Sequence, residues 1–331
     1  MFLSHIHNYR AFAIIGIISA HTLHAFQWND HPLLFKFLDT IFNQSSILFF
    51  FIAGFLFQYL SKRFEKWNFW KKKVQYVIIP YLILSVPSLY YYTQIAIQDN
   101  TWTGFYDYSL AKQIFFFLIT GKHLAPFWFV PTITIFYVFS PLFIKADHDK
   151  RIYWLLPLFM AISFYIGRDG GLGPINKAAY LFSIYLFGMF ASANHEYLLK
   201  IVKKYNIILL IMVIFLIVAN TLITGYGQYF IYLSKLIMCP LLVYYLYASR
   251  NFFGNRLNYL GHTSFGLFFI HAYVLPAIKI FYLKYTGHLD FPEGNLMSYI
   301  LLTLSVTLMC LIIIYLSQKI TRGYSRMLLG A

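Results

Sequence analysis

The stretch YNIILLIMVIFLIVANTLIT occupies positions 205–224 and contains no charged residue. A helix needs roughly 17 to 25 mostly apolar residues to cross a bilayer, so this stretch predicts a membrane span. Similar runs recur along the 331 residues, of which 60% are hydrophobic and 11% charged. Soluble domains carry about 25% charged residues, and continuous rather than alternating apolar runs argue against a membrane β-barrel. We therefore expect an all-α, polytopic membrane helical bundle.

Ten segments fit this pattern, although two of them are short. The expected spans are 11–28, 41–60, 74–95, 126–144, 152–167, 178–193, 205–224, 228–248, 259–283 and 296–318. The apolar stretch 110–119 is too short to span and is expected as an interfacial or re-entrant piece. There is no internal repeat, and the loops are short except for 96–125. We therefore expect a single membrane domain over residues 1–331.

The distribution of basic residues predicts the orientation of the spans. With a cytoplasmic N-terminus, 18 of the 26 Lys and Arg residues fall on the cytoplasmic side and six on the other. This bias indicates cytoplasmic N- and C-termini, because cytoplasmic loops are enriched in Lys and Arg. The net charge of +15 is then mainly a topology signal, and we expect no nucleic-acid partner. A role of the basic loops in ligand binding remains open.

The first expected span contains ionisable side chains, which are costly in a bilayer and often mark a functional site. Arg10 and His21 are eleven residues apart, roughly 16 Å along a helix and close to three full turns, so both point from one face. A guanidinium at the membrane surface can bind a phosphate, and a deeper histidine can take a proton from an attacking hydroxyl. The alternative is that Arg10 only anchors the helix and that His21 is a packing residue.

Four later segments extend the pattern begun by Arg10 and His21. They are FFFIAGFLF at 49–57, KKKVQYVIIPYL at 71–82, WFVPTITIFYVFSPLF at 128–143 and LGHTSFGLFFIHAYV at 260–274. Together, and in this order, the five pieces resemble the membrane acyltransferase-3 family over residues 5 to 320. One departure lies where the third span begins. Many members have a basic-x-x-basic pattern there, but in this chain the residue three positions after Lys73 is Tyr76.

The resemblance implies an O-acyltransferase of the bacterial cytoplasmic (inner) membrane. It would move an acyl group, most often acetyl, from cytoplasmic acyl-CoA to a hydroxyl of an envelope polysaccharide or a lipid-linked sugar. Arg10 would meet the CoA phosphates, with help from Lys71, Lys72 and Lys73. His21 would be the general base or a transient acyl carrier, and we favour the base because one proton transfer then completes the reaction. The partners are thus acyl-CoA as co-substrate, the glycan acceptor and membrane lipid, with no bound cofactor.

Three further side chains are candidates for the acceptor site or a tunnel, namely His24, Trp128 and His271. Trp128 could stack on a sugar ring or simply lie in the interfacial aromatic belt. His271 could instead serve packing through a hydrogen bond between helices. RDGGLGP at 168–174 is expected as an exposed turn, and the absence of a metal-ligand motif predicts no metal.

Two other functions remain open from the sequence. The chain could export polysaccharide without acyl transfer, although it lacks the duplicated half that many transporters show. It could also be a non-catalytic partner in glycan assembly. An exporter has no reason to bind CoA, and a scaffold would tolerate the loss of Arg10 or His21.

Overall fold

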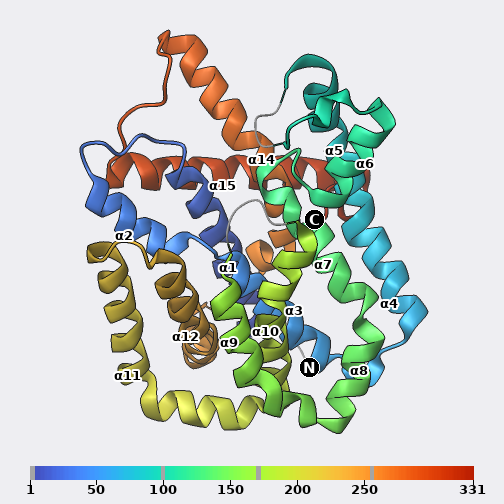
Figure 1. Ribbon diagram of the computed structural model, residues 1–331, viewed down its shortest axis with the longest axis vertical. Coiled ribbons are helices and arrows are strands. Elements are labelled where there is room, and N and C mark those ends of the chain that lie inside the picture. Colours follow the sequence, from blue (N-terminus) through green and yellow to red (C-terminus); the bar gives the residue numbers. More distant parts are fainter. Residues whose placement is uncertain (1–3, 98–100, 169–172, 254–256) are drawn as a thin grey trace.

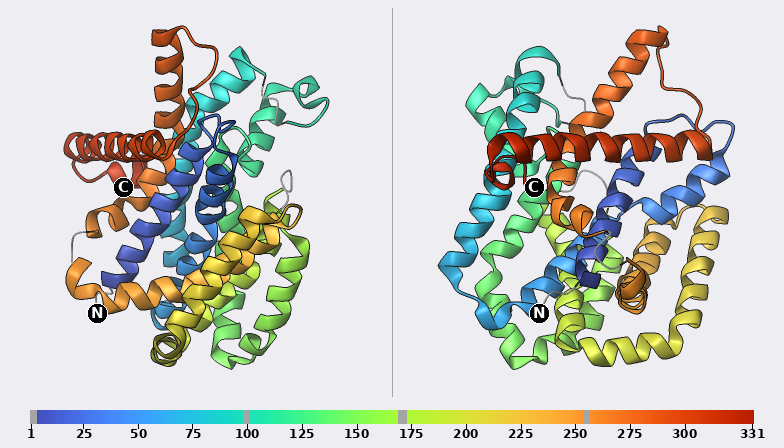
Figure 2. Two further views of the ribbon diagram at one scale, coloured as in Figure 1. Left: turned by 90° about the vertical axis from the view of Figure 1, so that its left-hand side faces the viewer. Right: turned by 180° about the vertical axis from the view of Figure 1, so that it is seen from behind.

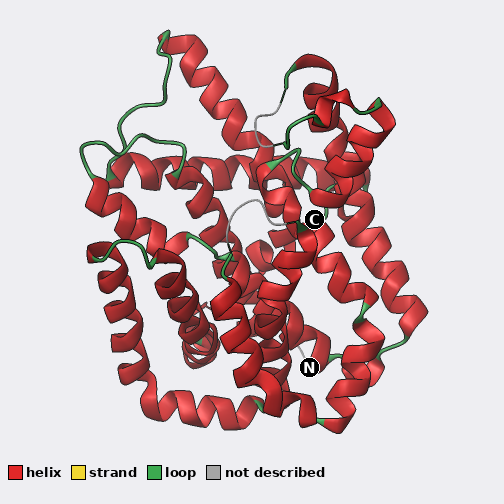
Figure 3. Ribbon diagram, in the orientation of Figure 1, coloured by secondary structure: helices red, strands yellow, loops and turns green. Residues whose placement is uncertain are grey.

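The computed structural model describes residues 4–97, 101–168, 173–253 and 257–331. Within these ranges the secondary structure is helical, apart from one isolated bridge between Gln27 and Glu293 (Figures 1 and 3). The all-α prediction is confirmed. The apolar composition explains it, because a helix satisfies its own backbone hydrogen bonds where no water is available.

Six helical segments in the described part of the chain are long and apolar enough to cross a membrane. They are Pro32–Tyr59 (α2, Pro32–Phe42, and α3, Ser46–Tyr59), Lys66–Ile95 (α4, Lys66–Lys73, and α5, Ile79–Tyr90, with π-helical turns), His195–Leu222 (α11), Gly227–Ala248 (α12), Asn258–Thr286 (α14) and Leu296–Thr321 (α15). A seventh candidate consists of α6 (Leu110–Thr120) and Ala125–Val138, which is η5 (Ala125–Trp128) followed by α7 (Phe129–Val138). These two pieces bend by 72°, as in a broken span or a re-entrant loop.

The other three expected spans are helical but are not among these candidates. They are 11–28, 152–167 and 178–193, which correspond to α1 (Ser4–Leu23), η6 with α9 (Arg151–Leu155 and Leu156–Ile166) and α10 (Pro174–Ala193). The chain is thus a multi-pass membrane protein, and the residues that the structure describes contain six or seven candidate spans by length and composition. Helix α1 ends at Leu23, so His24 lies in the turn that follows and not inside a span.

Helix α1 is the central element of the fold. It contacts α2, α3, α12, α14 and α15, and thirteen of its 20 residues are buried. Near its C-terminal end, the buried Thr22 Oγ1 of α1 lies 2.7 Å from Thr303 Oγ1 of α15. Figure 2 shows α1 inside the molecule and α15 crossing the other helices. Residues of α1 are therefore held from several sides.

Helices α3 and α10 approach each other so closely that only glycine fits at two positions. A Cβ atom at Gly54 would lie 2.0 Å from the carbonyl oxygen of Tyr185, and one at Gly188 would lie 1.9 Å from that of Phe51. Small residues allow such close backbone contact between membrane helices, where dispersion and polar contacts drive association. This contact fixes α3, whose N-terminal turn borders the candidate site.

The bend between α6 and η5 is held by a glycine and a histidine. Gly121 has a φ of +69°, and a Cβ there would lie 2.4 Å from the backbone nitrogen of Trp128. His123 is fully buried; its Nδ1 lies 3.0 Å from the Phe117 carbonyl oxygen and its Nε2 lies 2.8 Å from Ser85 Oγ. These contacts fix the position of Trp128 at the end of η5.

Candidate active site

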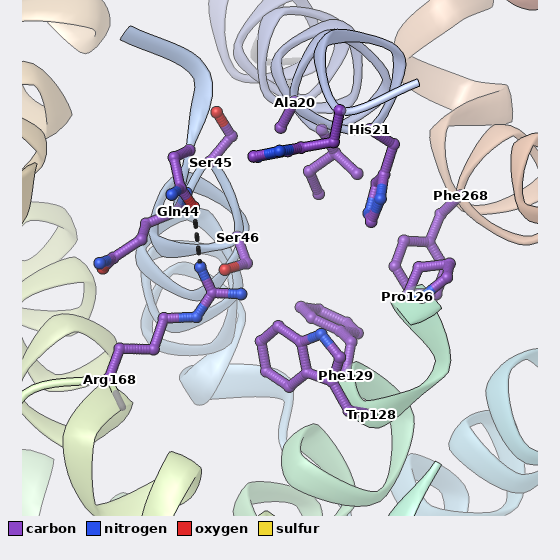
Figure 4. A pocket seen from close by; sticks show the side chains of 13 residues that line it. Ala20, His21, Gln44, Ser45, Ser46, Pro126, Trp128, Phe129, Arg168 and Phe268 are labelled. Atoms are coloured by element: carbon purple, nitrogen blue, oxygen red, sulfur yellow. Dashed lines mark hydrogen bonds between the residues drawn. The ribbon is translucent and has the colours of Figure 1, made fainter. Parts of the chain in front are cut away.

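A cavity of about 110 Å³ surrounds the side chain of His21. Its wall combines the end of α1, the turn between α2 and α3, η5 with the first residue of α7, the second residue after α9 and the middle of α14. The lining residues are Ile17, Ala20, His21, His24, Asn43, Gln44, Ser45, Ser46, Pro126, Trp128, Phe129, Arg168 and Phe268. Figure 4 shows His21, Arg168 and Trp128 around one space. Segments far apart in the sequence thus converge on a half-buried histidine.

His271 of α14 lies directly beside His21, with 5.2 Å between the ring centroids. Its Nδ1 is 2.9 Å from the carbonyl oxygen of Leu267. A carbonyl can only accept, so Nδ1 carries the proton and Nε2 of neutral His271 keeps its lone pair. This Nε2 is buried and has no hydrogen-bond partner in the described part of the chain. His271 therefore offers a free acceptor next to His21.

Trp128 and Arg168 form the opposite side of the cavity. The guanidinium carbon of Arg168 lies 5.2 Å from the centroid of the Trp128 ring, and Lys177 Nζ lies 4.6 Å from it. Arg168 also donates from Nη1 to Asn43 Oδ1 at 3.3 Å. Burial lowers the pKa of Arg168, but an arginine remains protonated at any physiological pH. A permanent positive charge therefore stands beside the aromatic face.

Arg168 was not expected here, because RDGGLGP was predicted to be an exposed turn. Arg168 is instead half-buried against the cavity, while Asp169 lies outside the described residues. One signal was available in the sequence. Only six basic residues fall on the presumed external side, so a basic residue there owes little to the positive-inside bias.

The turn between α2 and α3 is held in an unusual conformation. Gln44 has a φ of +57°, which costs a non-glycine residue on the order of 1 kcal/mol or more. Its side chain accepts a 2.6 Å hydrogen bond from the hydroxyl of Tyr180 in α10, and its backbone N–H donates to Asn43 Oδ1 at 2.7 Å. These hydrogen bonds offset the energetic cost of the left-handed conformation. Because the segment 43–46 lines the cavity, the same hydrogen bonds also hold the cavity wall in place.

Arg10 lies in the same helix as His21. Helix α7 runs alongside, so that its first residue lies near His21 and its end lies near Arg10. Phe129, at the start of α7, lines the cavity with His21, whereas Tyr137, near the end of α7, lies close to Arg10. Lys73 Nζ is 4.7 Å from the centroid of the Tyr137 ring. Arg10 and Lys73 thus belong to one cluster, a helix length away from the cavity.

The remaining predicted residues take different positions. Lys71 and Lys72 are exposed on α4, and no contact between either of them and Arg10 is found in the described structure. His24 is exposed at the rim of the cavity, where its Nε2 lies 3.2 Å from Asp39 Oδ1. The structure therefore brings together His21, His271 and Trp128, and separately Arg10 and Lys73.

Comparison with known sequences identifies the family. The profile of the acyltransferase-3 family, an acyltransferase domain, matches residues 5–315. The chain belongs to the acyltransferase-3 family. Neither the curated proteins nor the solved structures contain a match to it. As a membrane acyltransferase of this family, the chain acts on an acyl donor and an acceptor.

The cavity contains side chains that acyl transfer can use. A histidine can exchange the proton of the attacking hydroxyl, and a fixed positive charge can stabilise developing negative charge. In the ranges that the structure describes, no group of three or more His, Cys, Asp and Glu side chains could hold a metal ion.

Proposed function

We propose that the chain transfers an acyl group, most simply acetyl, from acyl-CoA to a hydroxyl of an envelope polysaccharide or a lipid-linked sugar. The observation that carries this proposal is the cavity in which His21 faces Trp128 and Arg168. The histidine can activate an acceptor hydroxyl, and the aromatic face can stack on a sugar ring. The cation can stabilise the oxyanion that forms during the attack. The cationic cluster of Arg10 and Lys73 favours acyl-CoA as the donor, because cationic side chains can bind the phosphate groups of CoA.

In this mechanism His21 takes the proton of the acceptor hydroxyl as the oxygen attacks the thioester carbonyl. The carbonyl oxygen becomes negative and lies within the field of the Arg168 guanidinium. When the carbon–sulfur bond breaks, His21 returns the proton to the departing CoA thiolate. The products are the O-acyl ester and free CoA, and His21 is restored. Exclusion of water while donor and acceptor are bound would also protect the thioester from hydrolysis.

His271 is proposed as a positioning residue for His21. Its unpartnered Nε2 can accept a hydrogen bond from the protonated nitrogen of the His21 ring after a small rotation of either side chain. That bond would leave the other nitrogen of His21 free to act as the base. The arrangement resembles other sites in which a second group orients a catalytic histidine.

The topology proposed with this function has ten crossings and cytoplasmic termini in a bacterial cytoplasmic membrane. The 18 to 6 division of basic residues supports it. Acyl-CoA would then approach the Arg10 end of α1 from the cytoplasm. The glycan would meet His21 from the opposite side, and no cofactor would be bound permanently.

The direct test is acyl transfer from radiolabelled acetyl-CoA in membranes that contain the wild-type chain or His21→Ala. We expect label in envelope glycan with the wild type and none above background with His21→Ala. His148→Ala is the matched control, because His148 is an exposed histidine of α8 (Ser140–Asp149) outside the site. Normal labelling by His21→Ala would exclude this mechanism. Glycan export without any labelling would favour a transporter.

A further inference from the structure

The C-terminal segment folds back onto the helices that surround Arg10. Helix α16 (Ser325–Leu328) contacts α5, α15 and the π-helical turn Val74–Ile78. The last residues pack closely on α14, since a Cβ at Gly266 would lie 2.3 Å from the Ala331 Cβ and one at Gly330 would lie 3.2 Å from Phe265. The position of α16 is therefore set by packing, and it places one more basic residue at this cluster.

That residue is Arg326. Its guanidinium carbon lies 4.4 Å from the centroid of the Tyr76 ring, so the planar group rests on an aromatic face, as arginine often does. Tyr76 lies three residues after Lys73, which makes the two residues neighbours on one helical surface. Arg326 is exposed. Its donors are therefore held in place while remaining accessible to a ligand.

Arg10, Lys73 and Arg326 act on one another electrostatically. Arg326 and Lys73 both lie near Arg10. Arg326 also lies near Lys73, because α16 packs on the turn Val74–Ile78 that directly follows Lys73. The two ion pairs in the described residues, His24–Asp39 and Asp149–Arg151, are elsewhere. Among the described residues these three like charges have no carboxylate partner, and they repel one another in a partly dehydrated setting. An anion bound between them would remove that repulsion.

We propose that Arg326 completes, with Arg10 and Lys73, a binding site for the phosphate groups of the CoA donor. This inference rests on the function proposed above and adds to it a residue from the far end of the chain. Arginine suits the role because its fork of donors matches phosphate oxygens in pairs. The C-terminal segment is thereby part of the donor site and not only a cap on α14.

A phospholipid headgroup offers the same phosphate chemistry, so the test must separate the two sources. The probe is free CoA, titrated calorimetrically into the purified full-length chain in a non-ionic detergent without phospholipid. The variants are Arg326→Gln, Arg326→Lys and Arg10→Gln. Arg322→Gln is the matched control, because it removes the same charge from an exposed residue just before α16.

We expect Arg326→Gln to weaken CoA binding about tenfold, which is the loss of one charged phosphate contact. Arg326→Lys should bind more tightly than Arg326→Gln because it keeps the charge, and Arg322→Gln should bind as the wild type does. The wild type should also lose affinity as the salt concentration rises. Dephospho-CoA, which lacks the 3′-phosphate, should bind the wild type more weakly than CoA does.

Equal CoA affinity for Arg326→Gln and Arg322→Gln would overturn the inference. If Arg10→Gln weakened binding in the same experiment, the proposed function would stand and only the role of Arg326 would fall. If the wild type bound no CoA, the donor assignment itself would fall. If Arg326→Gln lost affinity for anionic phospholipid in mixed micelles but kept its affinity for CoA, the site would belong to lipid and the inference would be wrong.

Discussion

Replacing Gly16 with alanine should narrow the candidate active site without touching any group that takes part in the chemistry. Gly16 is buried on α1, one residue before Ile17 of the cavity wall. A Cβ atom there would lie 2.7 Å from Ser45 Oγ and 3.1 Å from Ser45 Cβ, whereas ordinary contact begins near 3.4 Å. Either the two segments must therefore separate by about 0.7 Å, or Ser45 Oγ must turn away and the segments must separate by about 0.3 Å to relieve the contact with Ser45 Cβ.

Two costs follow from this displacement. Ser45 Oγ donates a 2.6 Å hydrogen bond to the Phe42 carbonyl, and turning it away would lose about 1 kcal/mol. Overpacking of this kind destabilises a protein by about 1–3 kcal/mol in total. A shift of about 1 Å in a site can cost about 100-fold in rate, so we expect about a tenfold loss of transfer, which corresponds to about 1.4 kcal/mol in the barrier.

The assay is acetyl transfer in membranes at matched expression, together with thermal unfolding in detergent. Gly173→Ala is the control, because a Cβ at Gly173 meets nothing within 4 Å. The double variant Gly16→Ala with Ser45→Gly should recover most of the activity, since it removes the clashing atoms. A wild-type rate and stability in Gly16→Ala, or no recovery of activity in the double variant, would exclude a steric clash between residue 16 and Ser45 as the cause.

Three other predictions concern single side chains. Trp128→Ala should raise the KM for the acceptor several-fold and leave the KM for acetyl-CoA unchanged, because it removes the aromatic face proposed for the sugar ring. It also removes the ring that positions Arg168 and Lys177, at about 0.5–1 kcal/mol for each cation–π contact. Equal changes in both KM values would contradict this prediction. His271→Ala should lower kcat about 10- to 100-fold with CoA affinity unchanged, as expected for a residue that orients another, and unaltered kcat would exclude that role. Lys73→Gln should weaken CoA binding in calorimetry. Lys71→Gln and Lys72→Gln, both at exposed positions, should change the CoA affinity less than twofold. Equal effects of all three would contradict this, because they would mean that the loop attracts CoA only through its total charge.

Much of the architecture could be predicted because the bilayer limits the choices. Each expected span coincides with at least one helical segment in the structure, and Arg10 and His21 lie in one helix as predicted. Span boundaries were less certain, since α1 stops at Leu23 where the chain turns toward α2. Periodicity cannot reveal such a turn, because it depends on tertiary contacts.

The composition of the site was harder to predict because it depends on contacts between distant segments. The closeness of His21 and His271 arises from the packing of α1 against α14. Arg168 lies in a loop whose pattern is typical of an exposed turn, and only the folded chain places it beside Trp128. Arg326 shows the same limit, because its neighbour Tyr76 is 250 positions away in the sequence.

The central claim is that one helix divides the work between Arg10, which binds the donor, and His21, which transfers the proton. The most direct measurement is CoA affinity and acetyl transfer for the same two variants, Arg10→Gln and His21→Ala, each purified and assayed at equal concentration. We expect His21→Ala to bind CoA as the wild type does and to transfer nothing, and we expect Arg10→Gln to lose at least tenfold in CoA affinity. Loss of CoA binding in His21→Ala, or full transfer by either variant at low donor concentration, would contradict it.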